Sequence, residues 1–465
     1  MGCRPAKIKA SCPNPHSLWG EADLTDTVTT DVAAQEVARD RGLIRAVGTW
    51  GLAFSIINGV VGAGIFSLPS AMTAAAGDKA ALAYVLCAIA MAAVVICFAE
   101  AASRIPTSGG AYGYVDAAFG PLWGFVTGVL TWLASVLACG GIAAALADGI
   151  GAFVPALDTI SARTAIILTV IVGFSWLNIR GVDPAARAIG VMTAIKLVPL
   201  LLFVILGAVT IAEMPAHAYT PATGENFGKA IILALFAFCG METPLAVSGE
   251  VAEPQKTIPR ALFISMGFVV VFYVAIQFVA QGLLGPGLAG SATPIADAMA
   301  VVSPGLGLVI LIGASFSRLV WIGSDLFGAP RILFAFARDG TLPGFLGTLH
   351  PRNATPFIAI IIHAAIAAAL AITGTFEPLA ILSTLATAGL YFLACAAAWK
   401  LSREGVALFG KPLGFRGMGA AAILGMVSMI VLTALAEWAE IAGLVIVVMG
   451  SVAFYWAQAK VKRAA

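Results

Sequence analysis

Charge is scarce in this 465-residue chain: Asp, Glu, Lys and Arg make up only 11% of the residues, whereas 60% are hydrophobic. Soluble domains carry roughly 25% charged residues, so the composition excludes an ordinary soluble fold. The net charge of +2 comes without a basic stripe, which excludes nucleic-acid binding. We predict an all-α polytopic membrane protein that is surrounded by membrane lipids.

Histidine and cysteine are also few, with four and seven residues. Most of the cysteines lie in apolar runs, and neither residue type shows metal-ligand spacing. We therefore expect no disulfide framework, no metal site and no cofactor. The chain also lacks a Ser/His/Asp set and a phosphate loop, so we expect no enzyme activity.

Long apolar runs recur at the ~20-residue length that spans a bilayer, and they predict about twelve membrane helices. The predicted spans are Trp50 to Ala76, Ala81 to Ser103, Ala111 to Leu146, Thr164 to Asn178, Ala188 to Ile211, Phe227 to Ser248, Ala261 to Leu284, Gly305 to Ala337, Pro356 to Thr373, Pro378 to Lys400, Gly417 to Leu435 and Trp438 to Ala459. The polar residues 1–48 predict a cytoplasmic tail, disordered from Met1 to Asp31 and at best an interfacial helix from Val32 to Arg45.

The basic residues predict the orientation of these spans. With the N-terminus inside, nearly all Lys and Arg residues outside the spans fall in inner segments, and only Lys79, Arg163 and Lys229 face outward. Positive-inside bias of this size predicts a multi-pass protein of the cell membrane with cytoplasmic N- and C-termini.

Two of the predicted spans are interrupted by helix breakers. Gly62 to Gly64 are followed by Pro69, and Phe238 to Gly240 are followed by Pro244. A membrane helix tolerates a broken backbone only where protein or an aqueous cavity satisfies the freed groups. The breaks fall in the first and sixth spans, which are equivalent positions in inverted-repeat transporters, so they predict a binding site. The alternative is that the glycines only let helices pack closely.

The two breaks offer opposite polarity to a ligand. Free amides at Ala63, Gly64 and Ile65 would start a half-helix, whose partial positive charge suits a carboxylate. Unwinding around the second break would leave the carbonyls of Phe238 and Cys239 as acceptors for an ammonium. A ligand with both groups is an α-amino acid.

Four motifs in order resemble one known family, the amino acid, polyamine and organocation permeases, over nearly the whole chain. They are Gly62-Ala63-Gly64-Ile65-Phe66 with Pro69, Pro106-Thr107-Ser108-Gly109-Gly110-Ala111-Tyr112, Phe236 to Glu242 running on to Pro254-Gln255-Lys256-Thr257-Ile258-Pro259-Arg260, and Pro330-Arg331 with Ala337-Arg338-Asp339-Gly340 and Pro343. The resemblance implies a five-plus-five inverted repeat of the LeuT type. Residues 49–211 would form the first repeat, 212–400 the second, and 401–465 two accessory helices with a short cytoplasmic tail.

The third span resembles the arginine/agmatine antiporter branch of that family, from Gly120-Pro121-Leu122 through Leu130 to Ala134. The branch carries a tyrosine at Thr131, an asparagine at Cys139 and a tryptophan at Phe236, so the smaller, less polar walls here favour a neutral amino acid at least as strongly. From the breaks and the resemblance together, the predicted substrate-binding residues are Val60, Gly62, Ala63, Gly64, Ile65, Ala134, Ser135, Cys139, Phe236, Phe238, Cys239 and Gly240.

Lys196 lies nine residues past Arg187, about 14 Å along a helix and so near the middle of a ~30 Å hydrocarbon core. Burial favours the neutral amine, so proton binding and release near neutral pH become possible. The family's proton-coupled symporters are similar in carrying a lysine in the fifth span, in a stretch like Thr193 to Leu200. Lys196 is predicted to couple transport to protons or, alternatively, to be a permanently charged structural tie.

Other ionisable side chains in the spans are functional candidates because their burial is costly. Glu242 matches a family carboxylate past the second break and would sense pH, line the inner pathway or anchor neighbouring helices. Arg318 and Asp325 are seven residues apart and share a helix face. Asp325 would meet a cationic side chain or form a salt bridge to another helix. Glu100 and Arg104 have the spacing of a structural or gate-related ion pair.

We therefore predict a secondary amino acid transporter, with proton symport by alternating access around the first and sixth spans. Exchange of an amino acid for its amine product is the alternative mechanism. A different class remains open, a membrane sensor or scaffold that transports nothing, and ligand-driven flux would exclude it.

Overall fold

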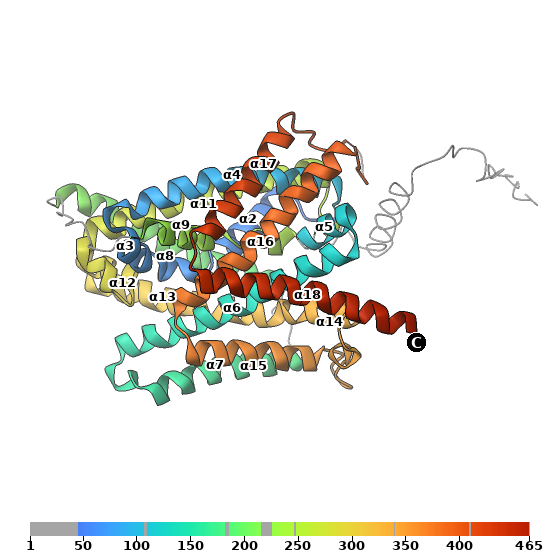
Figure 1. Cartoon of the computed structure of the whole chain (residues 1–465). Helices are drawn as coiled ribbons and strands as arrows, with labels where there is room; N and C mark the ends of the chain where they lie inside the picture. Colours follow the sequence, from blue (N-terminus) through green and yellow to red (C-terminus); the bar gives the residue numbers. More distant parts are fainter. Residues whose placement is uncertain are drawn as a thin grey trace, which may run out of the picture.

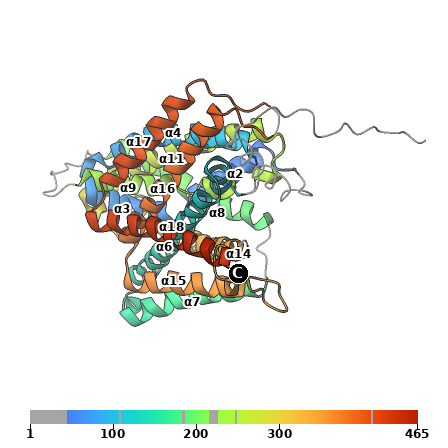
Figure 2. The same cartoon turned by 45° about the vertical axis from the view of Figure 1, so that its right-hand side comes forward.

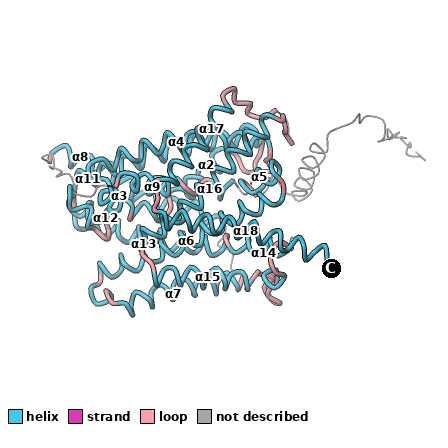
Figure 3. The backbone as a smooth tube through the Cα atoms, in the orientation of Figure 1, coloured by secondary structure: helices cyan, strands magenta, loops and turns pink. Residues whose placement is uncertain are grey.

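The computed structural model describes residues 45–106, 109–181, 186–214, 226–245, 248–338, 340–408 and 411–464. These ranges are helical and contain no named strand, only one isolated bridge between Val47 and Val251 (Figure 3). The predicted all-α fold is confirmed. The predictions for the N-terminal tail and its interfacial helix fall on residues 1–44, outside the described residues.

The helices follow one another along the chain with short 3₁₀ turns between some of them. They are α2 Thr49–Val60, η1 Ala63–Phe66, α3 Leu68–Ala76, α4 Ala80–Arg104, α5 Ala111–Phe119, α6 Pro121–Phe153, α7 Ile160–Ile179, α8 Ala186–Glu213, α9 Phe227–Phe238, α10 Glu242–Leu245, η4 Ser248–Glu250, α11 Pro254–Leu284, η5 Gly285–Gly290, α12 Pro294–Val302, α13 Pro304–Gly328, α14 Pro330–Arg338, α15 Phe357–Thr373, α16 Phe376–Arg403, α17 Met418–Ala434 and α18 Trp438–Ala464.

The helices have the length and composition of membrane spans. Among the described residues, 9 helical stretches are long and apolar enough to cross a membrane, and the shorter apolar helices α2, α15 and α17 accompany them. Large apolar side chains stay exposed on the outside, with Val271 at 71% and Ile446 at 70%. Such side chains suit contact with lipid, and each predicted span coincides with one or two described helices.

Two predicted spans each contain two helices. The third divides at Gly120, whose φ of +83° is open to glycine at little cost, and Pro121 then begins α6. The eighth ends at Gly328, and Pro330 begins the separate helix α14. Hydrophobicity runs through both boundaries, so the length of the apolar run alone did not reveal them.

The helices form one bundle (Figures 1 and 2). In both views α7 and α15 lie side by side along one edge, while α4, α11 and α17 lie on the opposite side. Helices α6 and α13 run between these layers, and α12 and α14 lie at opposite ends of the bundle. Of these two helices, α13 contacts η1, which follows α2. The division into two inverted repeats stays a prediction.

Candidate functional site

The first predicted break is present between α2 and α3. Helix α2 ends at Val60, and Gly62 takes an extended conformation with φ −81° and ψ −168°. The chain then makes the 3₁₀ turn η1 before α3, which carries Pro69 in its first turn. The first amide groups of a helical segment have no partner inside it. The amides at the start of η1 are the groups that the predicted carboxylate site would use, and that site stays a prediction.

The second predicted break lies between α9 and α10. Cys239 is extended, and Gly240 has a φ of +114°, a conformation that side chains disfavour. The Gly240 amide donates to the Glu242 carboxylate (3.1 Å), which also accepts a hydrogen bond from the Tyr391 hydroxyl (2.7 Å). Glu242 therefore anchors α10 to α16, as one of the sequence alternatives expected.

The two breaks touch each other through backbone. A Cβ on Gly240 would lie 2.7 Å from the Gly59 carbonyl oxygen, and a Cβ on Gly59 would lie 2.8 Å from the Gly240 carbonyl oxygen. Real Cβ atoms do not approach that closely, so the crossing requires glycine on both sides. Gly59 is a third glycine just before the first break, and close packing through glycines was the alternative that the sequence left open for this span.

Phe236 covers the first break. A Cβ on Gly64 would lie 2.7 Å from Cε1 of Phe236, and the ring meets Phe376 edge to face at 5.8 Å between centroids. The structure thus brings together Gly64 of the first span and Phe236 of the sixth, as predicted for two binding residues.

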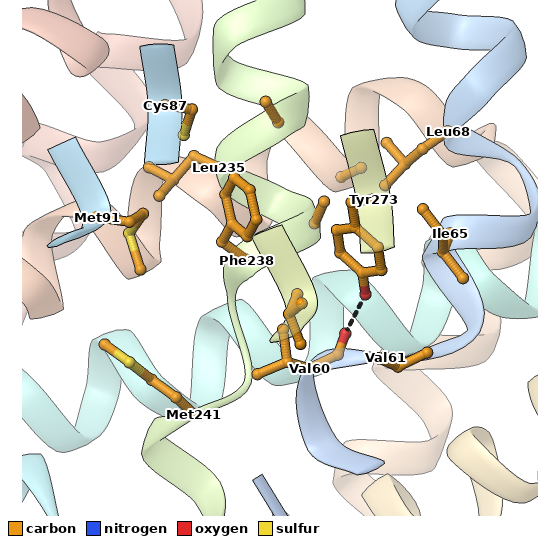
Figure 4. Close-up of a cluster of buried hydrophobic side chains, with 14 of the residues drawn as sticks. Val60, Val61, Ile65, Leu68, Cys87, Met91, Leu235, Phe238, Met241 and Tyr273 are labelled. Atoms are coloured by element: carbon orange, nitrogen blue, oxygen red, sulfur yellow. Dashed lines mark hydrogen bonds between the residues drawn. The ribbon is translucent and has the colours of Figure 1, made fainter. Parts of the chain in front are cut away.

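Phe238 points elsewhere, because residues two apart on a helix face nearly opposite ways. Its ring stacks on Tyr273 at 5.9 Å (Figure 4). It also meets Tyr84 edge to face at 6.1 Å. The Tyr273 hydroxyl donates to the Val60 carbonyl at 2.8 Å, at the end of α2. Phe238 therefore packs in an aromatic cluster behind the break, and closure of its ring over a ligand stays a prediction.

Lys196 lies directly beside the first break. Its side chain is 3% exposed, and Nζ donates to the Asn58 side-chain oxygen at 3.0 Å. Among the described residues no carboxylate pairs with this ammonium. The bond ties α8 to the last turn of α2. The sequence analysis missed Asn58, although an amide in an apolar run two residues before the break was a usable signal.

Asp325 belongs to a chain of hydrogen bonds that crosses three helices. Ser135 of α6 donates to Asp325 Oδ1, and the Asp325 Oδ2 atom lies 3.0 Å from Nε2 of His363 on α15. The indole Nε1 of Trp132 donates to His363 Nδ1 at 3.1 Å. Sequence reasoning expected a partner for Asp325 on another helix but missed His363 and Trp132, because His363 is 231 residues from Trp132 in the chain.

Cys139, Asp325 and His363 are donor types that hold metals, and their ligand atoms lie within 4.8 Å of one another. The Trp132 indole is a donor only, so it occupies the lone pair of His363 Nδ1. Nε2 then carries the ring proton and donates to Asp325. With no lone pair free on His363, this arrangement does not fit a metal ion.

Helix α13 lines the first break with two side chains. Arg318 is 1% exposed and donates from Nη2 to Ser67 at 2.8 Å, while its Nε and Nη1 have no hydrogen-bond partner among the described residues. One turn on, Nε1 of Trp321 would lie 3.2 Å from a Cβ on Gly62. Asp325 follows one turn further along α13, and its hydrogen bonds go to Ser135 and His363.

The predicted pair of Glu100 and Arg104 is also present. The two side chains are buried and meet at 2.7 Å near the end of α4. Arg104 donates further to the Val406 carbonyl at 2.9 Å, and Glu100 accepts from the Phe415 amide at 3.1 Å. The pair fastens α4 to the segment between α16 and α17.

Comparison with known proteins gives one consistent result. Residues 47–452 match a family described as "Amino acid permease". The "Branched-chain amino acid permease BcaP" of Bacillus subtilis is 27% identical over 374 residues, 75% of this chain and 78% of that protein. The "Uncharacterized transporter Rv1999c" of Mycobacterium tuberculosis is 31% identical over 343 residues, 73% and 74% of the two chains. The "Serine/threonine exchanger SteT" of Bacillus subtilis is 29% identical over 342 residues, 70% and 76% of the two chains.

Proposed function

Because this chain belongs to the amino acid permease family, and so is a membrane transporter and not an enzyme, we propose that it imports a neutral amino acid together with a proton. Transport proceeds by alternating access around the two breaks, in the cell membrane, with both termini in the cytoplasm. Exchange of one amino acid for another compound is the competing mechanism.

The breaks supply the groups that hold the amino acid. The amides at the start of η1 bind the carboxylate, and the carbonyls of Phe238 and Cys239, which end α9, bind the ammonium. Phe236 lies over Gly64 and closes the site from the side of α16. With its carboxylate and its ammonium held at the two breaks, the amino acid contacts α6 through its side chain.

The wall on α6 favours a neutral side chain. Ala134, Ser135 and Cys139 are small and uncharged, and Ser135 and Cys139 lie one turn apart on the same side of α6. BcaP is named for branched-chain amino acids and SteT for serine and threonine. Side chains of both kinds suit a wall of small, uncharged residues, so we propose small or branched neutral amino acids as substrates.

The bond between Lys196 and Asn58 is the observation that carries the proposal of proton coupling. A charged ammonium makes a stronger hydrogen bond than a neutral amine. Proton release from Lys196 therefore weakens the tie between α8 and the last turn of α2, beside the carboxylate-binding amides. Through this contact, the proton and the substrate act on the same segment.

Uptake into liposomes tests the proposal. Purified protein should accumulate a radiolabelled neutral amino acid when the outside is more acidic, and Lys196→Ala should lose the gradient dependence while still binding substrate. Lys229→Ala is the matched control, because Lys229 pairs with Glu377 away from the breaks. Gradient-driven uptake that persists undiminished in Lys196→Ala would refute the coupling role.

Preloaded liposomes separate symport from exchange. Symport predicts uptake into empty liposomes, whereas exchange requires a substrate inside them in both the wild type and the Lys196 variant. Any ligand-driven flux excludes the remaining alternative, a sensor or scaffold without transport.

A further inference from the structure

Of the hydrogen-bonded side chains Trp132, Ser135, Asp325 and His363, only Ser135 has a part in the mechanism above. They come from α6, α13 and α15, and the Asp325 and His363 side chains are 5% and 0% exposed. A carboxylate this deep in a membrane protein is costly and marks a functional site by default.

The direction of two of the bonds is fixed by chemistry. A tryptophan indole only donates, so Nδ1 of His363 must accept. A neutral imidazole then carries its proton on Nε2 and donates it to Asp325 Oδ2, 3.0 Å away. His363 cannot take up a second proton without losing the bond from Trp132. While the bond from Trp132 is in place, the imidazole is a donor to Asp325 and supplies no positive charge to it.

Ser135 is the member that can reverse its bond. A hydroxyl group both donates and accepts. With Asp325 ionised, Ser135 donates its proton to Oδ1. With a proton on Oδ1, Asp325 donates to the Ser135 oxygen instead, and the Ser135 hydroxyl proton turns to another acceptor. The added proton comes from water, no covalent bond other than O–H forms or breaks, and the heavy atoms keep their places.

No cation compensates the ionised form. Of the described titratable side chains on elements packed against α13, Cys139 and His363 lie against Asp325, and both are neutral donors. Five charged side chains on α13 and these elements bond elsewhere: Arg318 to Ser67, Lys196 of α8 to Asn58, Arg163 of α7 to Asp148, Asp297 of α12 to Thr293 and Arg331 of α14 to the Phe327 carbonyl. A buried carboxylate without an opposite charge is strongly disfavoured, which makes a proton its natural partner.

We propose that Asp325 is a second proton site, and that its protonation frees the Ser135 hydroxyl to donate a hydrogen bond to an acceptor oxygen of the bound amino acid. This inference rests on the proposed function, in which Ser135 lines the substrate site. Binding of the proton then raises the affinity for the substrate, and binding of the substrate raises the affinity for the proton. The reason is that the Ser135 hydroxyl donates to Asp325 whenever that carboxylate is charged.

Substrate affinity as a function of pH tests this site without requiring transport. If one proton is taken up together with the substrate, Kd rises about tenfold for each pH unit above the range in which the free site loses that proton. In Asp325→Asn the amide oxygen still accepts from His363 and the amide nitrogen donates to Ser135, which imitates the protonated acid. This variant should bind substrate, and the slope of log Kd against pH should fall by about one. Asp78→Asn, at an exposed position on the outer turn before α4, should keep the wild-type slope.

Infrared difference spectra give a signal that would not change on substrate binding if Asp325 had only a structural role. The carbonyl band of a protonated carboxyl group should appear on substrate binding in the wild type and be absent in Asp325→Asn. Ser135→Ala should keep an acid at Asp325 but lose affinity most at low pH. This variant keeps the test decisive if Asp325→Asn does not fold.

The outcomes separate the two proposals. A full wild-type slope in Asp325→Asn, or equal loss of affinity at all pH values in Ser135→Ala, would overturn the second proton site. Loss of gradient-driven uptake in Lys196→Ala with a full slope in Asp325→Asn leaves the proposed function intact and removes only this inference. A reduced slope in Asp325→Asn with undiminished gradient-driven uptake in Lys196→Ala supports Asp325 and overturns Lys196.

Discussion

An alanine at position 240 would meet two separate penalties. Its Cβ would lie 2.7 Å from the Gly59 carbonyl oxygen, and its backbone would have to hold a φ of +114°. Overpacking of this kind costs about 1–3 kcal/mol. The left-handed conformation adds about 1–2 kcal/mol for a residue with a side chain. We expect Gly240→Ala to lower the free energy of unfolding by the sum of these two amounts.

Gly59→Ala is the matched variant that separates the two penalties. Its Cβ would meet the Gly240 carbonyl oxygen at 2.8 Å, so the overlap is nearly the same. Gly59 lies inside α2, however, where alanine gains about 0.5–1 kcal/mol over glycine. Gly240→Ala should therefore be less stable than Gly59→Ala by about 1.5–3 kcal/mol.

Thermal unfolding of the purified variants measures this difference. Gly267→Ala serves as the control, because a Cβ there has nothing within 4 Å and lies inside α11. The expected order of melting temperature is Gly267→Ala at or above wild type, then Gly59→Ala, then Gly240→Ala. Equal stability of the variants at 59 and 240 would refute the strain argument, and wild-type stability of both would refute the backbone crossing.

Three further outcomes follow from the same site. Gly64→Leu should abolish substrate binding in a folded protein, because Phe236 would lie 2.7 Å from the new Cβ; unchanged affinity would contradict this. Esterified and N-acetylated substrate analogues should both fail to compete for uptake, and competition as strong as that of the parent amino acid would disprove the carboxylate and ammonium sites. Ser67→Ala should destabilise the protein by about 1.5–3 kcal/mol in thermal unfolding, since it removes the one described hydrogen bond of the buried Arg318 guanidinium. A neutral effect would mean that this bond contributes nothing.

The breaks could be predicted from sequence because their causes are local. Glycine and proline change the backbone where they stand, and a lone lysine such as Lys196 is conspicuous in an apolar run. Gly120 was less visible, since it ends α5 through a positive φ while the hydrophobic run continues past it.

The hydrogen-bonded chain at Asp325 could not be predicted in the same way. His363 looked isolated, and its meaning comes from two contacts made across 38 and 231 residues of sequence. Such contacts depend on how α6, α13 and α15 pack, and a helical period fixes only which face of each helix a residue occupies. Gly59 raises the same difficulty, because its role depends on the approach of a segment 181 positions later.

Backbone hydrogen bonds join the segment before α2 to the segment after α10, so these parts of the two broken spans are held together. The Val47 amide donates to the Glu250 carbonyl at 3.0 Å, and the Ala252 amide donates to the Val47 carbonyl at 3.0 Å. Together with the crossing at Gly59 and Gly240, these bonds pin the two segments to each other at both ends. Neither segment can swing without carrying its partner, so under the proposed function the two would move together as one rigid gate that turns about the breaks.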